Sequence, residues 1–242
     1  MVRRTLGDAL RQLGAELAAE ATDADGLRQA LKGNVIDLLV ADDDLSGLAT
    51  ADIVRDIRRG DLHDHPFPLI VLLANRQDER ELRALIDSGS DAIVLTPVSV
   101  AAITQKLDVL AARKQFVVAR DYVGPNRRAA TRSGCGMPLT IEVPNPLRAG
   151  ADRVAFNRAL DKAKADLKCK LAECAYGQLT WAIQTNRISE FADLIPLVER
   201  MRQTAANPWA KAAATGLVKA LRAESRSDIM GWCEKLLAAQ TR

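Results

Sequence analysis

The 242-residue sequence predicts an α/β domain, built on a parallel sheet with helices on both faces, followed by an all-α region. Three observations support this fold class. Short apolar runs alternate with amphipathic segments over the first 112 residues, which is typical of a parallel sheet. Helix-forming residues dominate from Ala151 onward, and a stretch rich in Gly, Pro and Arg lies between. We therefore divide the chain into residues 1–114, a linker over 115–150, and a helical bundle or dimerisation domain over 151–242.

The composition is that of an ordinary globular protein, with 48% hydrophobic and 27% charged residues. No apolar stretch approaches the roughly 20 residues that a membrane-spanning helix needs, and the first residues lack the pattern of a secretory signal. We therefore expect a cytoplasmic protein without membrane contact. The four cysteines form no C-x-x-C pair, so we expect reduced thiols rather than a zinc site or disulfides.

Charge is distributed unevenly along the chain. Residues 1–112 hold 12 Lys and Arg against 19 Asp and Glu, a net charge of −7. Residues 113–158 hold 9 against 3 (+6), and residues 159–242 hold 13 against 9 (+4). A basic region can meet nucleic acid or an acidic protein surface, and we favour protein contacts.

The first elements are short. Leucines at helical spacing predict a helix over Thr5–Leu13, which Gly14 then ends. Ala15–Ala21 is expected to be extended, and Asp25 is expected to cap a helix over Gly26–Leu31.

The remaining elements of the first region alternate regularly. Val35–Ala41 is a nearly continuous apolar run, as expected of a strand buried on both faces, and Asp42 follows it directly. Ligands and chemistry in such sheets lie at the carboxyl ends of the strands, where Asp42 falls. The later elements are expected as a helix over 51–58, a strand over 68–74, a helix over 78–88, a strand over 92–95 and a helix over 100–113.

Three of these segments together resemble the receiver domain of bacterial response regulators. DLLVADDDLSGLATADIVRDIRR is similar to the third strand, phospho-acceptor loop and third helix of that family. PLIVLLANRQD resembles its fourth strand, and SGSDAIVLTPVS its fifth. The resemblance covers roughly residues 2–112. It implies a flavodoxin-like, doubly wound fold with strand order 2-1-3-4-5, whose first strand is absent from this chain.

The resemblance also implies a phosphorylation site and a switch. Asp42 takes the phospho-acceptor position, and Mg²⁺ would be held by Asp42 and the backbone of Asp44, provided that an acidic pair precedes Met1. The switch positions are less favourable. Leu73 replaces a hydroxyl residue, Ile93 replaces an aromatic one, and Thr96 replaces the lysine before the usual proline, here Pro97. We therefore expect weak or no phosphorylation at Asp42.

Loss of the first strand would leave buried backbone groups unpaired. Three sources could fill the gap: residues upstream of Met1, a strand from a partner subunit, or a strand elsewhere in this chain. Gln115–Ala119 is the best internal candidate because it is short and rich in β-branched residues.

Irregular or extended structure is expected over 120–150, with a turn at Gly124-Pro125, solvated side chains at Arg127 and Arg128, and a short strand over Leu139–Val143. Anion binding by the two arginines is the alternative to solvation. His63 and His65, in the loop before a strand, are also interpreted as solvated.

Four helices are expected in the last region, over 151–185, 189–204, 207–223 and 227–239. Asn207 and Pro208 form a good start for the third. Trp181, Trp209 and Trp232 lie in these helices and are expected in the core.

These features favour a response-regulator-like signal-transduction protein of a phosphorelay, which is not an enzyme. It would act by protein–protein interaction or as a homodimer, with a sensor kinase or another signalling protein as partner. One alternative is a basic helical output domain that binds nucleic acid, although no compact helix-turn-helix spacing supports it. Another is an enzyme of a different doubly wound family with Asp42–Asp44 at its metal site, but no Gly-rich phosphate loop or nucleophile elbow is present.

Overall fold

The structure is a computed structural model that describes residues 2–12, 14–45, 48–75, 78–111, 115–119, 121–127, 139–148, 152–184, 189–205 and 207–240. The chain separates into two compact units. The first unit comprises residues 1–117, 122–133 and 142–163, and the helical unit comprises residues 118–121, 134–141 and 164–242.

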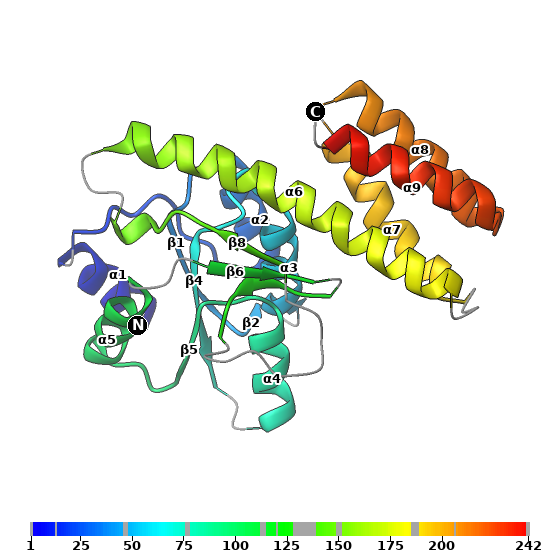
Figure 1. Ribbon diagram of the computed structural model, residues 1–242. Coiled ribbons are helices and arrows are strands. Elements are labelled where there is room, and N and C mark those ends of the chain that lie inside the picture. The colour runs from blue at the N-terminus through cyan, green and yellow to red at the C-terminus, as the bar shows by residue number, and fades with distance from the viewer. Residues whose placement is uncertain are drawn as a thin grey trace. The chain divides into compact units, whose positions relative to one another are not determined.

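The first unit is built on a three-stranded parallel sheet in the order β1-β4-β5 (Figure 1). Its strands are β1 (Leu38–Asp42), β4 (Leu69–Ala74) and β5 (Ala92–Leu95). The register places Asp42 opposite Leu73, and Leu73 opposite Val94. The structure confirms the three strands that the apolar runs predict, together with their parallel arrangement.

Helices pack against both faces of this sheet (Figure 1). Apolar side chains of α1 and α5 pack on one face, and those of α2, α3 and α4 on the other. The five helices are α1 (Val2–Gln12), α2 (Ala24–Gly33), α3 (Thr50–Arg59), α4 (Glu79–Asp87) and α5 (Val100–Leu110). The α/β class with two covered faces is confirmed.

The central strand β4 divides its side chains between the two faces. Leu69, Val71 and Leu73 belong to the cluster with α5, whereas Ile70 and Leu72 belong to the cluster with α2, α3 and α4. This alternation follows from the two-residue period of a strand. All six β4 residues are buried, and each large apolar side chain contributes about 1.5–3 kcal/mol relative to exposure. The continuous apolar run therefore reflects burial on both faces.

The helix starts depend on capping side chains. Asp23 is the cap of α2, because its side chain accepts a hydrogen bond from the backbone N–H of Gly26 at 2.8 Å. The expectation that Asp25 caps this helix is wrong, since Asp25 lies within the first turn. Asp78 and Ser99 cap α4 and α5 in the same way.

Two smaller sheets complete the strands. β2 (Asp44–Leu45) and β3 (Leu48–Ala49) form a short antiparallel hairpin. The other three strands, in the order β7-β6-β8, are β6 (Gln115–Val118), β7 (Val123–Pro125) and β8 (Leu139–Glu142), and the short 3-10 helix Pro146–Arg148 follows them.

The second edge of β1 pairs with no strand among the described residues. The hypothesis that Gln115–Ala119 fills this position is wrong, because β6 is hydrogen-bonded to β7 and β8 instead. The Asp37 carbonyl oxygen accepts from the Leu69 N–H, and the Asp43 N–H donates to the Leu73 carbonyl oxygen, so both groups face β4. Backbone groups alternate in direction along a strand, and those of Leu38 and Val40 therefore face the second edge of β1.

The two histidines are buried, at 6% and 3% exposure for His63 and His65. The His63 ring nitrogens lie 2.9 Å from the carbonyl oxygens of Asn34 and His65, and His65 Nδ1 accepts a hydrogen bond from the backbone N–H of Phe67. Their interpretation as solvated loop residues is wrong, because the loop before β4 folds inward and its backbone groups need these partners.

The helical unit holds α7, α8, α9 and most of α6, and within it α8 packs against both α7 and α9. The helices are α6 (Arg153–Gln184), α7 (Ser189–Thr204), α8 (Pro208–Arg222) and α9 (Arg226–Gln240). The boundaries lie close to those predicted. Gly216 of α8 lies directly against the ring of Trp232 in α9, where an added Cβ would come within 2.4 Å of the ring.

The expectation that all three tryptophans are core residues is wrong, since Trp181 is 44% and Trp209 is 74% exposed. A helical segment in this part of the chain therefore does not by itself place a tryptophan in the core. Among the described helices, none has the length and hydropathy needed to cross a membrane.

Candidate functional site

Asp42 is the last residue of β1 and therefore stands at the carboxyl end of the parallel sheet. The residue is exposed, in contrast to buried Leu39, the second residue of the same strand. Parallel strands place their carboxyl ends at one edge of a sheet, so the segments that follow β1, β4 and β5 begin at this edge. The predicted phospho-acceptor position is thus accessible from solvent.

The backbone around Asp42 is fixed by its neighbours. The Thr50 hydroxyl donates a hydrogen bond to the Asp42 carbonyl oxygen at 2.6 Å, and the Thr50 N–H donates to the Asp43 carbonyl oxygen at 3.1 Å. The Asp43 N–H donates in turn to the Leu73 carbonyl oxygen at 2.9 Å. Thr50 is itself buried at the first position of α3. These bonds connect the end of β1 to the start of α3.

The pKa of the Asp42 carboxyl is raised above its usual value. The principal cause is partial burial, because protein atoms around the carboxyl displace water and disfavour its charged form. The neighbouring charge of Asp43 raises the pKa further. The neighbouring charge that shifts the pKa of this carboxyl is therefore the negative charge of Asp43 and not a cation.

Leu73 lies in register with Asp42 on the adjacent strand, about 4.8 Å away across the sheet. It is only 5% exposed and packs in the cluster that includes α5. Ile93 is partly buried and packs against the opposite cluster, with α2, α3 and α4. The structure thus places Leu73 next to the Asp42 position and directs Ile93 to the other face of the sheet.

Thr96 and Pro97 follow β5 and are joined by a cis peptide bond. The Thr96 N–H donates to the Ala74 carbonyl oxygen at 2.9 Å, and its hydroxyl donates to Asn75 Oδ1 at 3.0 Å. These bonds connect the ends of β4 and β5. Thr96 supplies a hydroxyl that is already engaged with Asn75, and it supplies no positive charge.

The described residues do not fit a complete magnesium site. Asp42 offers one exposed carboxylate, and Asp44 lies in the β2–β3 hairpin, where it pairs with Ala49. In the described part of the chain, no group of three or more His, Cys, Asp or Glu side chains is placed to hold a metal ion. Because Mg²⁺ favours octahedral oxygen coordination, one carboxylate and one carbonyl leave most of its coordination to water.

Two residues of this edge were not identified from the sequence, namely Thr50 and Asn75. Thr50 stands where a segment of acidic and small residues gives way to an amphipathic helix, which is a recognisable position for a hydroxyl that bonds to backbone. Asn75 follows β4 in a polar loop, and its contact with Thr96 joins residues 21 apart in the chain. Only the folded sheet reveals that contact.

Comparison with known proteins relates part of this chain to one class. The chain is distantly similar to CheY-like receiver domains of response regulators over slightly less than half of its length. The particular relatives are the chemotaxis protein CheY-3 of two strains of Vibrio cholerae serotype O1. Each is 27% identical to this chain over 107 residues, which is 44% of this chain and 81% of the relative. No protein-family model matches the chain.

Among solved structures, the chain is similar to a response regulator protein from Burkholderia pseudomallei, described with a phosphorylated aspartic acid, a calcium ion and citrate. The TM-score is 0.38 with 18% sequence identity, and the match covers 45% of this chain and 64% of that one.

Proposed function

We propose that this chain is a receiver-like signalling protein of a two-component phosphorelay. It acts through protein–protein contact or self-association, and phosphoryl transfer to Asp42 is weak or absent. The partner is a sensor kinase or another signalling protein, and the protein works in the cytoplasm. The observation that carries this proposal is the exposed Asp42 at the carboxyl end of a parallel strand, with buried Leu73 as its in-register neighbour.

The weak phosphorylation follows from the surroundings of Asp42. Efficient phosphoryl transfer requires cations that neutralise the charge developing on the transferred group. Here, Asp43 contributes a second negative charge, and Thr96 provides a hydroxyl that donates to Asn75. Leu73 has no hydroxyl that could follow a phosphoryl group. Among the described residues, the sheet edge therefore keeps a carboxylate at the nucleophile position, and the only charge that shifts its pKa is the negative charge of Asp43.

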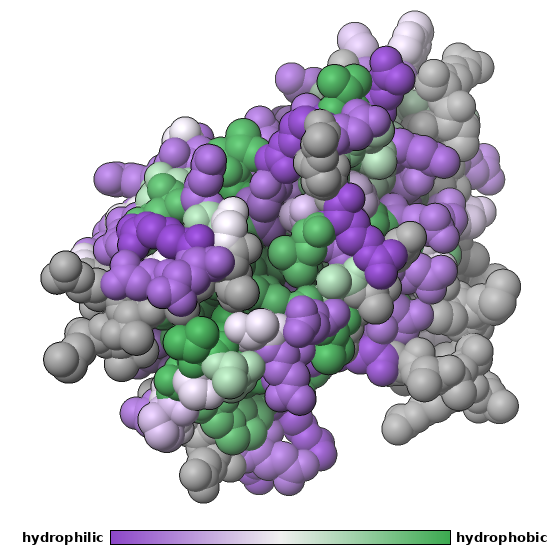
Figure 2. All heavy atoms as spheres, turned by 90° about the vertical axis from the view of Figure 1, so that its left-hand side faces the viewer, coloured by the Kyte–Doolittle hydropathy of each residue, from purple (hydrophilic) through white to green (hydrophobic). Residues whose placement is uncertain are grey.

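Protein contact as the output is supported by the surface of the first unit. Apolar side chains reach the surface seen in Figure 2, where green areas interrupt the purple ones. The large apolar residues that are more than 40% exposed on this unit are Leu17, Val35, Leu95, Val100, Val109, Leu147 and Val154. Where such side chains lie next to one another, they form contiguous apolar area of the kind that associates with other proteins.

Mass measurement after incubation with Mg²⁺ and acetyl phosphate tests the proposal. Wild type, Asp42→Ala and the matched control Asp43→Ala are compared, with an active receiver domain as the positive control. We expect the positive control to gain one phosphoryl group and the wild type to remain essentially unmodified. Near-complete modification that is present in wild type and Asp43→Ala but lost in Asp42→Ala would contradict weak phosphorylation.

A second measurement tests the output. We expect sedimentation to show a dimer whose mass does not depend on the phosphodonor, and no retardation of random duplex DNA at low salt. A monomer at all concentrations would contradict self-association. Retardation of DNA that falls steeply with salt would contradict protein contact as the output and would support nucleic-acid binding in its place.

A further inference from the structure

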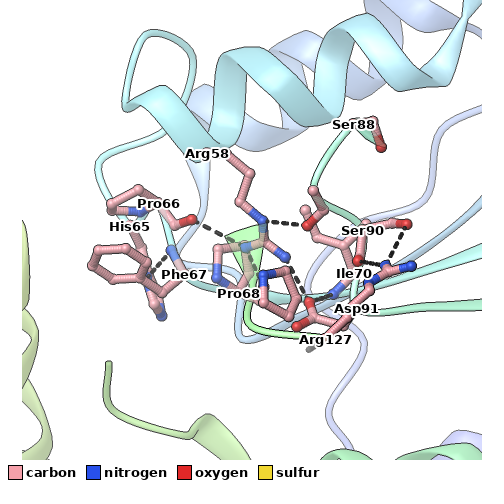
Figure 3. A network of polar contacts seen from close by, with 12 residues as sticks. Arg58, His65, Pro66, Phe67, Pro68, Ile70, Ser88, Ser90, Asp91 and Arg127 are labelled. Atoms are coloured by element: carbon pink, nitrogen blue, oxygen red, sulfur yellow. Dashed lines mark hydrogen bonds and ion pairs between the residues drawn. The ribbon is translucent and has the colours of Figure 1, made fainter. Parts of the chain in front are cut away.

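A fully buried arginine joins two loops at the amino-terminal end of the sheet, opposite the Asp42 edge (Figure 3). Arg58 Nε donates to the Gly89 carbonyl oxygen at 2.8 Å, and Nη1 donates to those of Pro66 and Pro68 at 3.0 and 2.7 Å. Nη2 donates to Asp91 Oδ2 at 2.5 Å. One side chain near the end of α3 thus holds the segments that lead into β4 and β5.

Asp91 neutralises this arginine and fixes the sheet at the same time. Its Oδ2 also accepts the N–H of Ile70 at 2.7 Å, while its own N–H donates to the Ile70 carbonyl oxygen. Burial lowers the pKa of the Arg58 guanidinium, and the Asp91 charge opposes that effect. The charges of this buried pair therefore compensate each other, and protein groups supply the hydrogen bonds that water would otherwise make.

Phe116 covers the Arg58 guanidinium from the strand β6. The guanidinium carbon lies 4.9 Å from the centre of the Phe116 ring, a favourable cation–π distance. Phe67 meets the same ring edge to face, with 5.4 Å between ring centres. Phe116 is 5% exposed, so this contact excludes water from the ion pair.

The segment 122–127 crosses the turn before β5 with its backbone in direct contact. Gly89 has φ +93°, and a Cβ added there would lie 2.3 Å from the Val123 carbonyl oxygen. A Cβ added to Gly124 would lie 2.7 Å from the Gly89 Cα. The two glycines therefore allow an approach that no other residue permits.

Side-chain and backbone bonds fasten this crossing. The Arg127 guanidinium donates to the Ser90 carbonyl oxygen (Figure 3), so its expected solvation is only partial. The Asn126 N–H donates to the Gln115 carbonyl oxygen at 2.9 Å and closes the segment on β6. The Tyr122 hydroxyl donates to the Pro125 carbonyl oxygen at 2.9 Å. The expected turn at Gly124-Pro125 is wrong, because both residues belong to the strand β7. Arg128 lies outside the described residues.

We propose that residues 115–117 and 122–127 form a strap that closes the amino-terminal end of the first unit. The strap holds the turn over residues 88–91 in place by backbone contact at Gly89 and Gly124, and it seals the Arg58–Asp91 pair with Phe116. The sequence Tyr-Val-Gly-Pro-Asn-Arg thus fixes the strap to the sheet. The smallest part of the chain that folds as the first unit includes the strap rather than ending at α5.

Hydrogen exchange on the full chain tests the strap with a matched pair of variants. Gly89→Ala and Gly60→Ala both place a side chain at positive φ, but only Gly89 has a blocking atom, since nothing lies within 4 Å of a Cβ at Gly60. We expect Gly89→Ala to speed exchange of the amides of 122–127 at least roughly tenfold more than Gly60→Ala does. Equal effects of the two variants on these amides would overturn the proposal.

If Gly89→Ala unfolds the whole first unit, the variant Arg127→Ala tests the strap instead. This variant leaves the backbone crossing intact and removes the bond to Ser90. We expect roughly tenfold faster exchange in 122–127, with the amides of β4 unchanged. Exchange in 122–127 that stays within about twofold of wild type would overturn the strap. The result is independent of whether Asp42 accepts a phosphoryl group.

Discussion

Asp91→Ala should be among the most damaging single substitutions in the first unit. The variant leaves the Arg58 guanidinium buried at 0% exposure without its counter-charge, and it removes the acceptor of the Ile70 N–H. Breaking a buried ion pair by removing one partner costs about 3–5 kcal/mol. Three carbonyl oxygens still accept from Arg58, which keeps the expected cost within this range rather than above it.

Hydrogen exchange in β4 measures this cost for the first unit alone. A loss of about 3 kcal/mol corresponds to roughly a hundredfold faster exchange of the amides of 71–74, if they exchange through opening of the unit. The matched control is Glu79→Ala, which removes an ion pair with Arg83 whose side chains are 78% and 71% exposed. An exposed pair of this kind contributes about 0–1 kcal/mol. If Asp91→Ala speeds exchange of these amides no more than Glu79→Ala does, the buried pair contributes no more to stability than an exposed one, and the prediction is refuted.

Three other predictions concern the sheet edge and the helical unit. Because the pKa of Asp42 is raised in the folded state, the stability linked to this group is full below its ordinary pKa of about 3.9 and is lost as pH rises through the folded pKa. Asp42→Asn should therefore have a higher urea midpoint than wild type at neutral pH, and the difference should vanish in acid; an equal midpoint at neutral pH would contradict the shift. Gly216→Ala forces a methyl group into the Trp232 ring and should destabilise the helical unit by about 1–3 kcal/mol, whereas Gly231→Ala, with open space, should stabilise it by up to about 1 kcal/mol. Tryptophan fluorescence in urea distinguishes the two, and the same sign for both variants would refute the packing argument. Burial raises the pKa of the Cys233 thiol to about 12, so iodoacetamide should modify it far more slowly in the native than in the unfolded protein, as peptide mapping would show; equal rates would contradict its burial.

Strands and helices could be predicted well from the sequence because local patterns determine them. Each of the three sheet strands is an apolar run between polar segments, and the predicted strand over 92–95 coincides with β5. The position of Asp42 at a strand end follows from the same pattern. The capping error at Asp25 is small, since Asp23 and Asp25 lie two residues apart at the start of the same helix.

Long-range contacts could not be predicted in this way. Nothing local distinguishes buried Arg58 from the partly exposed arginines Arg55 and Arg59 of the same helix, because the partners of Arg58 lie 8 to 33 residues further along the chain. The pairing of β6 with β7 and β8 likewise depends on the complete fold, and β-branched residues alone favour a strand without indicating its sheet. Burial of His63 and His65 follows from the path of the loop before β4.

We propose above all that self-association of this protein does not depend on phosphorylation of Asp42. Sedimentation velocity of the full chain, with and without Mg²⁺ and acetyl phosphate, tests it most directly when wild type and Asp42→Ala are run side by side. We predict one dimeric species of unchanged mass in all four samples. A change in assembly on adding the phosphodonor, seen in wild type and missing in Asp42→Ala, would contradict the account.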